Sequence, residues 1–321
     1  MEYRELGRTG LRVSEISFGA WGIGGDAWIG ASEDESVRAL HRALDLGVNL
    51  IDTARGYGES ERIVGGVVKG RDSVYVATKV PPLNGQWPAP AGLSPDETFP
   101  GAHIRSSLET SLSVSGLDHV DILQLHVWDD AWIGRGDWLE TVADLKREGK
   151  IRFFGVSIND YQPSNGVVLV RSGQVDTVQA IYNVFHQAPE EELLPACAES
   201  GVGVIVRVAL DEGGLTGRVG PGSTFPDGDF RNDYFGGDRL AQVGEHVDAL
   251  VADLGIDREE LPALALRFVL ADPAVATIAT GMRTVRNVER NAAVSDGTPL
   301  PAEVRAALAK HQWERDFYQP S

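Results

Sequence analysis

Four side chains that can hold or transfer a proton follow short apolar segments in the first half of the chain. Asp52 and Tyr57 lie in LIDTARGYG, Lys79 lies in VATKV and His126 lies in LQLHVW. Each could serve a structural purpose alone, as a turn cap, a half-buried aromatic, a surface charge or a core histidine. Together they end consecutive apolar segments. Because burying an unpaired charge is costly, we expect the four groups to pair or to act together.

The chemistry open to this set is delivery of a proton to a carbonyl oxygen. A tyrosine has a pKa of about 10 and is a poor acid at neutral pH until a cation stabilises its phenolate. In this interpretation Lys79 is the cation, and Asp52 keeps Lys79 charged and oriented. His126 orients the carbonyl oxygen against Tyr57. The donors would then face the oxyanion that develops as a hydride reaches the carbonyl carbon.

The elements that must position these residues alternate along the chain. Apolar segments of strand length occur at 14–18, 48–51, 74–77, 120–125, 153–157, 177–181, 203–206 and 275–278. Amphipathic segments of helix length occur at 33–46, 59–69, 103–116, 137–148, 189–199, 237–254 and 284–292, with further helices expected at 258–271 and 301–312. Such alternation requires a parallel α/β sheet, and eight units favour a closed (β/α)8 TIM barrel over an open, doubly wound sheet.

The remaining segments predict a hairpin and two functional loops. The alternating pattern from Tyr3 to Phe18 indicates an N-terminal β-hairpin that runs into the first strand. No linker is evident, so we expect residues 1–321 to form a single domain. The stretches 81–100 and 218–238 follow the third and seventh strands and are long and irregular, as functional or mobile loops usually are. Both leave the carboxyl ends of strands, where barrel enzymes hold their chemistry.

The composition limits the classes of partner. A chain of 321 residues with 42% hydrophobic and 24% charged residues is typical of a globular protein. Its net charge of -18 would repel nucleic acids and anionic membranes, and no apolar run is long enough for a membrane helix. The single cysteine, Cys197, and a start without a signal-peptide pattern favour a cytoplasmic location. A phosphorylated cofactor would need a local cluster of basic residues to overcome the acidic field.

Four motifs resemble a known family. The segments GVNLIDTARGYGESERIVG, VYVATKV, DILQLHVWD and GVSIND are similar to successive signatures of the aldo-keto reductase superfamily, in the same order. The resemblance runs from the hairpin to Asn291. It implies a TIM barrel that reduces an aldehyde or ketone to an alcohol with NADP(H). It also implies that Asp52, Tyr57, Lys79 and His126 are catalytic, with Tyr57 as the general acid.

A glycine-rich dinucleotide fingerprint is not expected. Gly22, Gly24 and Ala27 fit the spacing G-x-G-x-x-A, but the next residues continue a loop up to a helix cap at Ser32. The fingerprint requires a strand, a tight turn and then a helix that points at pyrophosphate. The match is therefore interpreted as a coincidence of spacing.

The resemblance implies a different cofactor site. It assigns the nicotinamide carboxamide to Ser157, Asn159 and Gln179. It also puts Arg207 where the family usually has an aromatic residue, so we expect the guanidinium of Arg207 to lie against the nicotinamide ring.

The segment TGMRTVRNVERN resembles the part of the family that binds the adenosine phosphate. This assigns Gly281, Arg283, Asn287 and Asn291 to the cofactor. Arg283 would hold the 2′-phosphate, so NADPH is the expected cofactor and NADH is the alternative.

The substrate and several alternatives stay open. Trp21 and Trp128 are expected to wall the substrate pocket, with Trp28, Trp87 and Trp132 as further candidates. Because the chain after Asn291 is short, the loop 81–100 rather than a long terminal loop is expected to select the substrate. The substrate would be a small carbonyl compound or alcohol, and the oligomeric state is not predicted.

One alternative function is a dehydrogenase that oxidises a sugar or another secondary alcohol with the same residues. Another is a regulatory subunit that binds the cofactor without turnover, although such a protein could lose Tyr57. A hydrolase that pairs Asp52 with Asp129 or Asp130 leaves Lys79 and Tyr57 without a role. No metal site is expected, because no two of the seven histidines have ligand spacing.

Overall fold

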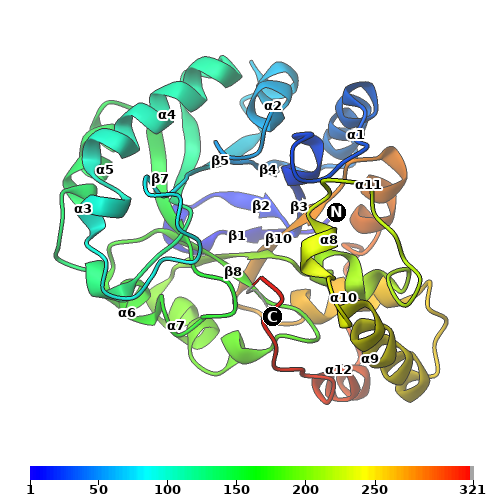
Figure 1. Ribbon diagram of the computed structural model, residues 1–321. Helices are drawn as coiled ribbons and strands as arrows, with labels where there is room; N and C mark the ends of the chain where they lie inside the picture. Colours follow the sequence, from blue (N-terminus) through cyan, green and yellow to red (C-terminus); the bar gives the residue numbers. More distant parts are fainter. Residues whose placement is uncertain (319–321) are drawn as a thin grey trace.

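Eight parallel strands close into a barrel in the computed structural model of the protein, which describes residues 1–318 (Figure 1). The strands are β3 (Ile16–Gly19), β4 (Leu50–Asp52), β5 (Tyr75–Val80), β6 (Val120–Leu125), β7 (Ile151–Ser157), β8 (Thr177–Ile181), β9 (Gly203–Arg207) and β10 (Val275–Gly281). They follow one another around the barrel in chain order, and β10 closes it against β3. Each coincides with a segment expected from the sequence, so the prediction of a (β/α)8 barrel is confirmed.

Helices surround the barrel and cover the outer faces of its strands (Figure 1). Those expected from the sequence are α1 (Glu33–Asp45), α2 (Ser60–Val68), α4 (Gly101–Ser115), α5 (Trp138–Arg147), α7 (Leu193–Ser200), α9 (Arg239–Leu254), α10 (Leu261–Leu270), α11 (Val285–Ala292) and α12 (Ala302–Ala309). Helix α1 begins where predicted, because Ser32 accepts a hydrogen bond from the amide of Glu35. Three short helices were not expected: α3 (Pro95–Thr98), α6 (Val167–Ser172) and α8 (Arg231–Tyr234).

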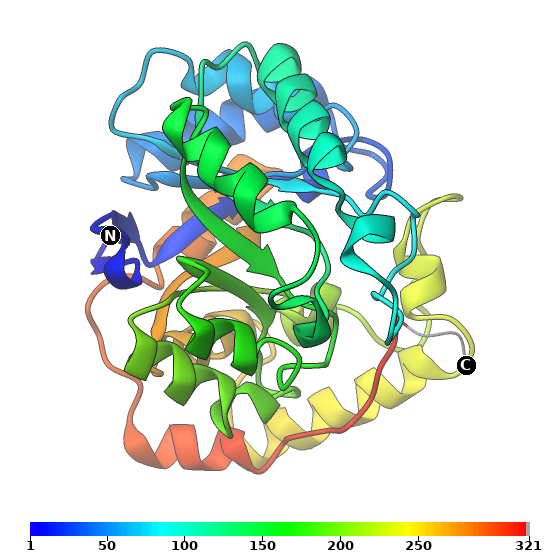
Figure 2. The same cartoon turned by 90° about the vertical axis from the view of Figure 1, so that its left-hand side faces the viewer.

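The expected hairpin closes the amino end of the barrel. Strands β1 (Tyr3–Glu5) and β2 (Arg12–Ser14) pair antiparallel in a sheet of their own. Apolar side chains of the hairpin pack with residues of the barrel strands: Leu6, Leu11 and Val13 with Leu50, Ala77, Ile122, Ile205 and Ala276. Gly7 makes the close approach possible, because a Cβ there would lie 2.3 Å from the amide nitrogen of Gly203. Figure 2 shows the hairpin at the end of the barrel opposite the long loops.

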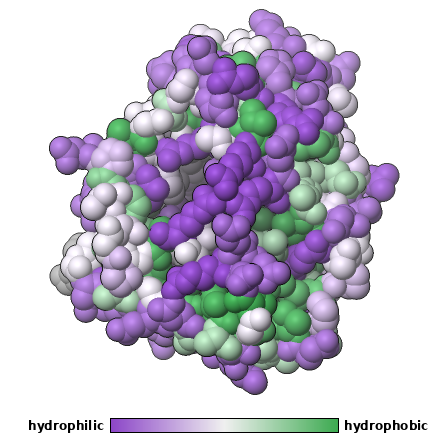
Figure 3. Space-filling view, turned by 90° about the vertical axis from the view of Figure 1, so that its right-hand side faces the viewer, coloured by the Kyte–Doolittle hydropathy of each residue, from purple (hydrophilic) through white to green (hydrophobic). Residues whose placement is uncertain are grey.

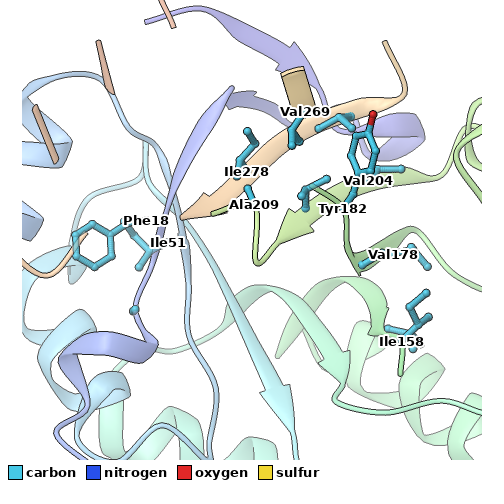
Figure 4. Packing of buried hydrophobic residues seen from close by; sticks show 14 of the residues in the cluster. Phe18, Ile51, Ile158, Val178, Tyr182, Val204, Ala209, Val269 and Ile278 are labelled. Carbon is cyan, nitrogen blue, oxygen red and sulfur yellow. The ribbon is translucent and has the colours of Figure 1, made fainter. Parts of the chain in front are cut away.

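The main core lies between the barrel strands and the helices. Phe18 of β3 pairs with Ile51 of β4, and Ile278 of β10 lies near Val269 of α10 (Figure 4). All four side chains are fully buried. This packing fixes the strands, whose carboxyl ends therefore present their polar residues at defined positions.

Two long loops and the C-terminal segment gather at the carboxyl end of the barrel (Figure 2). In the loop 218–238, the amide of Phe230 donates to the carbonyl of Ala27 at 2.8 Å, and Asp229 accepts from the amide of Ile29 at 3.1 Å. The loop after β9 is thereby joined to the loop after β3. No helix among residues 1–318 is long and apolar enough to cross a membrane.

Candidate active site

The carboxyl ends of the strands surround a cavity of about 780 Å³. Asp52, Tyr57 and His126 line the cavity, and Lys79 is fully buried beside Asp52. They come from three neighbouring strands and the loops that follow them, because Asp52 ends β4, Lys79 lies in β5 and His126 follows β6. The four residues selected from the sequence are therefore brought together.

Lys79 and Asp52 form a buried ion pair at the base of the site. The ammonium of Lys79 donates to Oδ2 of Asp52 at 2.6 Å and to the carbonyl of Thr53 at 2.8 Å. The other oxygen of Asp52 accepts from the amide groups of Gln179 at 2.8 Å and Gln124 at 3.2 Å. Burial lowers the pKa of Lys79, and the carboxylate of Asp52 opposes that lowering.

Gln124 was not singled out in the sequence. It lies in β6, in register with Lys79 of β5. Its position in LQLHVW, at the carboxyl end of a strand that also leads to His126, was the signal that could have identified it.

The phenol of Tyr57 faces the imidazole of His126 across the cavity wall. Oη of Tyr57 lies 3.5 Å from Nε2 of His126, and the ammonium of Lys79 lies 4.8 Å from the centroid of the Tyr57 ring. Gly24 lets the neighbouring loop approach Tyr57, because a Cβ there would lie 2.1 Å from the Tyr57 carbonyl oxygen. The phenol and the imidazole therefore lie together on the cavity wall where a carbonyl oxygen could be held, and the ammonium lies buried beside the phenol ring.

The electrostatics of this point differ in one respect from the expectation. Burial, together with the charge of Asp52, raises the pKa of Tyr57 well above its usual value, although a lowering by Lys79 was expected. Burial and the cations Lys79 and Arg207 lower the pKa of His126 well below its usual value. The resting site therefore holds a protonated phenol beside a neutral imidazole, which is the state that a proton donor needs before it reacts.

Aromatic side chains form much of the wall, but not all of those expected. Trp21 stacks on Tyr57 with ring centroids 5.8 Å apart, and Trp87 meets His126 edge to face at 4.4 Å. Trp28 also lines the cavity. Trp128 does not, contrary to the expectation, because the chain turns after β6 and carries its side chain into the core against Trp132.

A second buried ion pair lies beside these four residues. Arg207, at the end of β9, donates to Oδ1 of Asp160 at 2.6 Å and to the carbonyl of Ile158 at 3.0 Å. The indole of Trp87 donates to the other oxygen of Asp160 at 3.1 Å. Arg207 lines the cavity with its guanidinium held in place by these partners. Asp160 was not selected from the sequence, although it directly follows Asn159 in GVSIND.

The three residues expected at the nicotinamide carboxamide have different surroundings. Gln179 lines the cavity, and its Oε1 is buried without a hydrogen-bond partner in residues 1–318. Ser157, opposite Gln179 in the sheet, is fully buried and does not line the cavity, and its Oγ also lacks a partner within the described chain. Asn159 does not line the cavity: its amide bonds to the backbone of Ala89 and Trp128 and so anchors the loop after β5.

Arginine side chains gather along the cavity although the protein is strongly acidic. Five of them line it: Arg207, Arg218, Arg231, Arg283 and Arg290. Arg283 donates to the carbonyl of Ile29 at 3.2 Å and lies 5.8 Å from the Trp28 ring centroid. Gly281, Asn287 and Asn291 line the same part of the cavity, and Asn291 donates to Thr280 and to the carbonyl of Gly281. Five carboxylates line the same cavity, and Arg207 and Arg231 are ion-paired, so within residues 1–318 Arg218, Arg283 and Arg290 are the lining arginines that form no ion pair.

Arg218 and Arg231 come from the loop 218–238, which the sequence analysis identified only as long and irregular. Arg231 lies over the Trp28 ring at 4.6 Å and pairs with Asp229, which is almost completely buried. Figure 3 shows that the face on the side of α9 and α11 is mostly hydrophilic and is hollowed near its centre.

The C-terminal segment reaches the cavity, contrary to the expectation that the short tail would leave substrate selection to the loop 81–100. Arg315 forms an ion pair with Asp211 and donates to the phenol of Tyr161 at 2.9 Å. Tyr318 lines the cavity and donates a hydrogen bond to Glu212. No local pattern near residue 318 could have indicated this contact, since its partners lie over 100 positions away.

Three comparisons with known proteins agree on the family. Residues 15–312 match the model of the Aldo/keto reductase family. The chain is 34% identical over 240 residues to aldo-keto reductase YhdN of Bacillus subtilis, with 72% of this chain and 69% of the relative covered. It is 32% identical to an NADH-specific methylglyoxal reductase of Escherichia coli, with 90% and 91% covered. The holo structure of aldo-keto reductase AKR11C1 from Bacillus halodurans superposes with a TM-score of 0.74 at 29% identity, covering 97% of this chain and 96% of that one.

Proposed function

Because the chain belongs to the aldo/keto reductase family of NAD(P)H-dependent oxidoreductases, we propose that it reduces an aldehyde or ketone to an alcohol with NADPH. Tyr57 is the general acid in this proposal. The observation that carries it is the convergence of a phenol, a neutral imidazole and a buried ammonium: Tyr57, His126 and Lys79. A carbonyl oxygen between the phenol and the imidazole would accept two hydrogen bonds.

Two features support a nicotinamide cofactor. The buried Oε1 of Gln179, which lines the cavity, lacks a partner within residues 1–318, and the amide group of a carboxamide would supply the donor that it needs. The arginines along the cavity, Arg283 and Arg218 among them, suit phosphate groups in a protein with a net charge of -18. When bound, the reduced nicotinamide supplies the hydride, and Arg207 would lie against its ring.

The residues of the chain then control the proton. As the carbonyl carbon gains the hydride, negative charge develops on its oxygen, and the phenol of Tyr57 transfers its proton to that oxygen. The phenolate that remains is stabilised by the ammonium of Lys79, which Asp52 and the Thr53 carbonyl hold in position. His126 stays neutral and orients the oxygen throughout. The carbonyl has then gained one hydride and one proton and has become an alcohol.

The test is the substitution Tyr57→Phe, which removes only the phenolic oxygen. Wild-type protein should oxidise NADPH, followed by absorbance, with members of a panel of aldehydes, ketones and sugars. We expect the variant to lose about 10²- to 10⁴-fold in kcat, the usual contribution of a positioned acid, and to bind NADPH as tightly as wild type by fluorescence titration. Undiminished turnover in the variant would rule out Tyr57 as the general acid.

The alternative functions are a dehydrogenase and a regulatory subunit. A dehydrogenase that oxidises a sugar or another secondary alcohol would use the same residues in reverse, and the NADH-specific relative supports an NADH-linked reaction as the second candidate. A regulatory subunit without turnover is disfavoured, because such a protein has no need of the complete set Asp52, Tyr57, Lys79 and His126. A lone cysteine supports a reducing cytoplasm as the location.

A further inference from the structure

Glu212 brings a carboxylate to the cavity on an unusual backbone turn. It lies in the 3₁₀ segment η5 (Asp211–Thr216), which follows β9, and it lines the cavity that Tyr57 and His126 also line. The φ angles of Asp211, Glu212 and Gly213 are +54°, +50° and +106°. Residues with a side chain rarely adopt such angles, and they cluster at functional sites when they do. The turn therefore holds Glu212 at the cavity wall at a conformational cost.

Glu212 differs from the neighbouring carboxylates in its partner. Three carboxylates near it each pair with a cation: Asp52 with Lys79, Asp160 with Arg207 and Asp211 with Arg315. Within residues 1–318, Glu212 has no ion pair, and it accepts a hydrogen bond from the phenol of Tyr318. A carboxylate has about four acceptor positions, so one phenol leaves most of its capacity free toward the cavity.

Near neutral pH the carboxyl group of Glu212 can accept a hydrogen bond in either protonation state, and it can also donate one when protonated. Burial raises the pKa of Glu212 to about 7, while the hydrogen bond from Tyr318 and the charge of Arg207 act in the opposite direction. The charge of Glu212 in turn contributes to the raised pKa of Tyr57, so the two groups interact across the cavity. A hydrogen-bond acceptor therefore lies within electrostatic reach of the proposed general acid.

We propose that Glu212, held by Tyr318, binds a hydroxyl group of the substrate while Tyr57 and His126 bind its carbonyl oxygen. The preferred substrates are then hydroxylated aldehydes and ketones rather than plain ones. A site built to hydrogen-bond a hydroxyl discriminates strongly against an analogue that lacks it. The inference rests on the proposed carbonyl reduction, and it adds the class of carbonyl. The other hydroxyl that could reach Glu212 is one on the ribose of the cofactor.

The first experiment compares two substrates of similar size in the wild-type enzyme. Glyceraldehyde carries hydroxyl groups and propanal carries none. We expect kcat/KM for glyceraldehyde to exceed that for propanal by about 10-fold or more. Turnover of both without preference would contradict the hydroxyl subsite alone. Turnover of neither, with the wider panel also inactive, would contradict the proposed function and with it this inference.

The second experiment assigns the preference to Glu212. Glu212→Met should reduce the ratio of the two kcat/KM values by about 10-fold, and Tyr318→Phe should reduce it by a smaller factor. The control Glu259→Met, which removes another carboxylate from the cavity wall, should leave the ratio as in wild type. The dissociation constant of NADPH, from fluorescence titration, should be the same for wild type and Glu212→Met.

A rise in that dissociation constant with an unchanged ratio would assign the hydroxyl to the cofactor ribose and overturn the inference. An unchanged ratio with unchanged NADPH binding would overturn it as well. If circular dichroism shows that Glu212→Met does not fold, Tyr318→Phe decides, because it removes one oxygen and keeps the ring that packs against Tyr161.

Discussion

The buried ion pair between Lys79 and Asp52 acts mainly on the chemistry of neighbouring groups and contributes little net stability. Removing both ions from water costs about as much as their attraction returns, so the pair is retained for what it does to its neighbours. Here it fixes a positive charge 4.8 Å from the centre of the Tyr57 ring. Two amide groups on the other oxygen of Asp52 keep the carboxylate in one orientation.

The coupling between Lys79 and Asp52 can be measured from the free energies of unfolding of the two single variants and the double variant. Lys79→Met leaves Asp52 buried without its cation, and Asp52→Asn leaves Lys79 without its carboxylate. Each substitution should lower the free energy of unfolding by about 3–5 kcal/mol, since an uncompensated charge remains buried. The double variant should lose less than the sum, because neither charge remains. Urea unfolding followed by circular dichroism measures the cycle, and strictly additive losses would contradict it.

His186 predicts how stability depends on pH. Burial and the cations Arg315 and Arg207 lower the pKa of His186 to about 4, and its Nε2 has no partner within residues 1–318. Because the unfolded chain takes up the proton at about pH 6.5, acidification below that value favours unfolding. At about 1.4 kcal/mol per pKa unit, the loss between pH 6.5 and 4 is about 3 kcal/mol. In His186→Gln, urea unfolding should give a shallower fall over this range, and an equal fall in both proteins would be inconsistent with the assignment.

At the scale of elements, α11 and the loop before it are expected to choose between NADPH and NADH. Arg283→Ala should raise the dissociation constant of NADPH by about 10- to 100-fold, the loss of one or two charge-assisted hydrogen bonds, and should leave that of NADH little changed. The control is Arg286→Ala, because Arg286 of α11 is exposed and lies outside the cavity. Fluorescence titration measures the dissociation constants of both cofactors. An equal increase for NADPH and NADH would contradict the assignment of Arg283 to the 2′-phosphate.

The loop 218–238 is expected to control the dissociation rate of the cofactor. Asp229 joins this loop to the amide of Ile29 and orients Arg231. Asp229→Ala should therefore raise the dissociation rate constant of NADPH by about 10-fold, in line with the loss of a buried charged hydrogen bond. Asp227→Ala, an exposed position of the same loop, is the matched control. Stopped-flow fluorescence gives both rates, and no difference between the two variants would contradict this role.

Elements with a strong periodic pattern were predictable, and elements decided by packing were not. All eight strands coincide with apolar segments of the sequence, since most residues of each strand are buried. Helix α6 was missed because its sequence, VVLVRS, is rich in β-branched residues and is typical of a strand. Packing against α7 and the short 3₁₀ segment η3 (Asp130–Trp132) overrides that local preference.

The grouping of the residues proposed to be catalytic was predictable for a related reason. Asp52, Lys79 and His126 are polar exceptions at the ends of apolar strands, and parallel strands bring such ends together. Glu212 and Tyr318 carry no local signal, since one depends on a left-handed turn and the other on a distant chain contact. Trp128 was misplaced because β6 ends at Leu125 and the chain beyond it turns the Trp128 side chain into the core.

At the scale of the whole molecule, the net negative charge of the protein and the arginines along the cavity act on the cofactor over different distances. At about 0.01 M salt the screening length is about 30 Å, so an approaching polyanion experiences the full charge of -18. At about 0.15 M it is about 8 Å, and only the arginines near the cavity act. The association rate constant of NADPH should therefore rise between these salt concentrations. Stopped-flow binding measures it, and a fall would show that the arginines dominate at long range.

The hairpin that closes the amino end of the barrel has a consequence for the order of events. With that end filled by Leu6, Leu11 and Val13, both reactants must enter, and both products leave, through the carboxyl mouth. The dinucleotide would lie beneath the loop 218–238, deeper than the carbonyl compound. If so, we expect the nucleotide to bind first and leave last, and a competitor bound at Tyr57 and His126 to slow the release of the nucleotide.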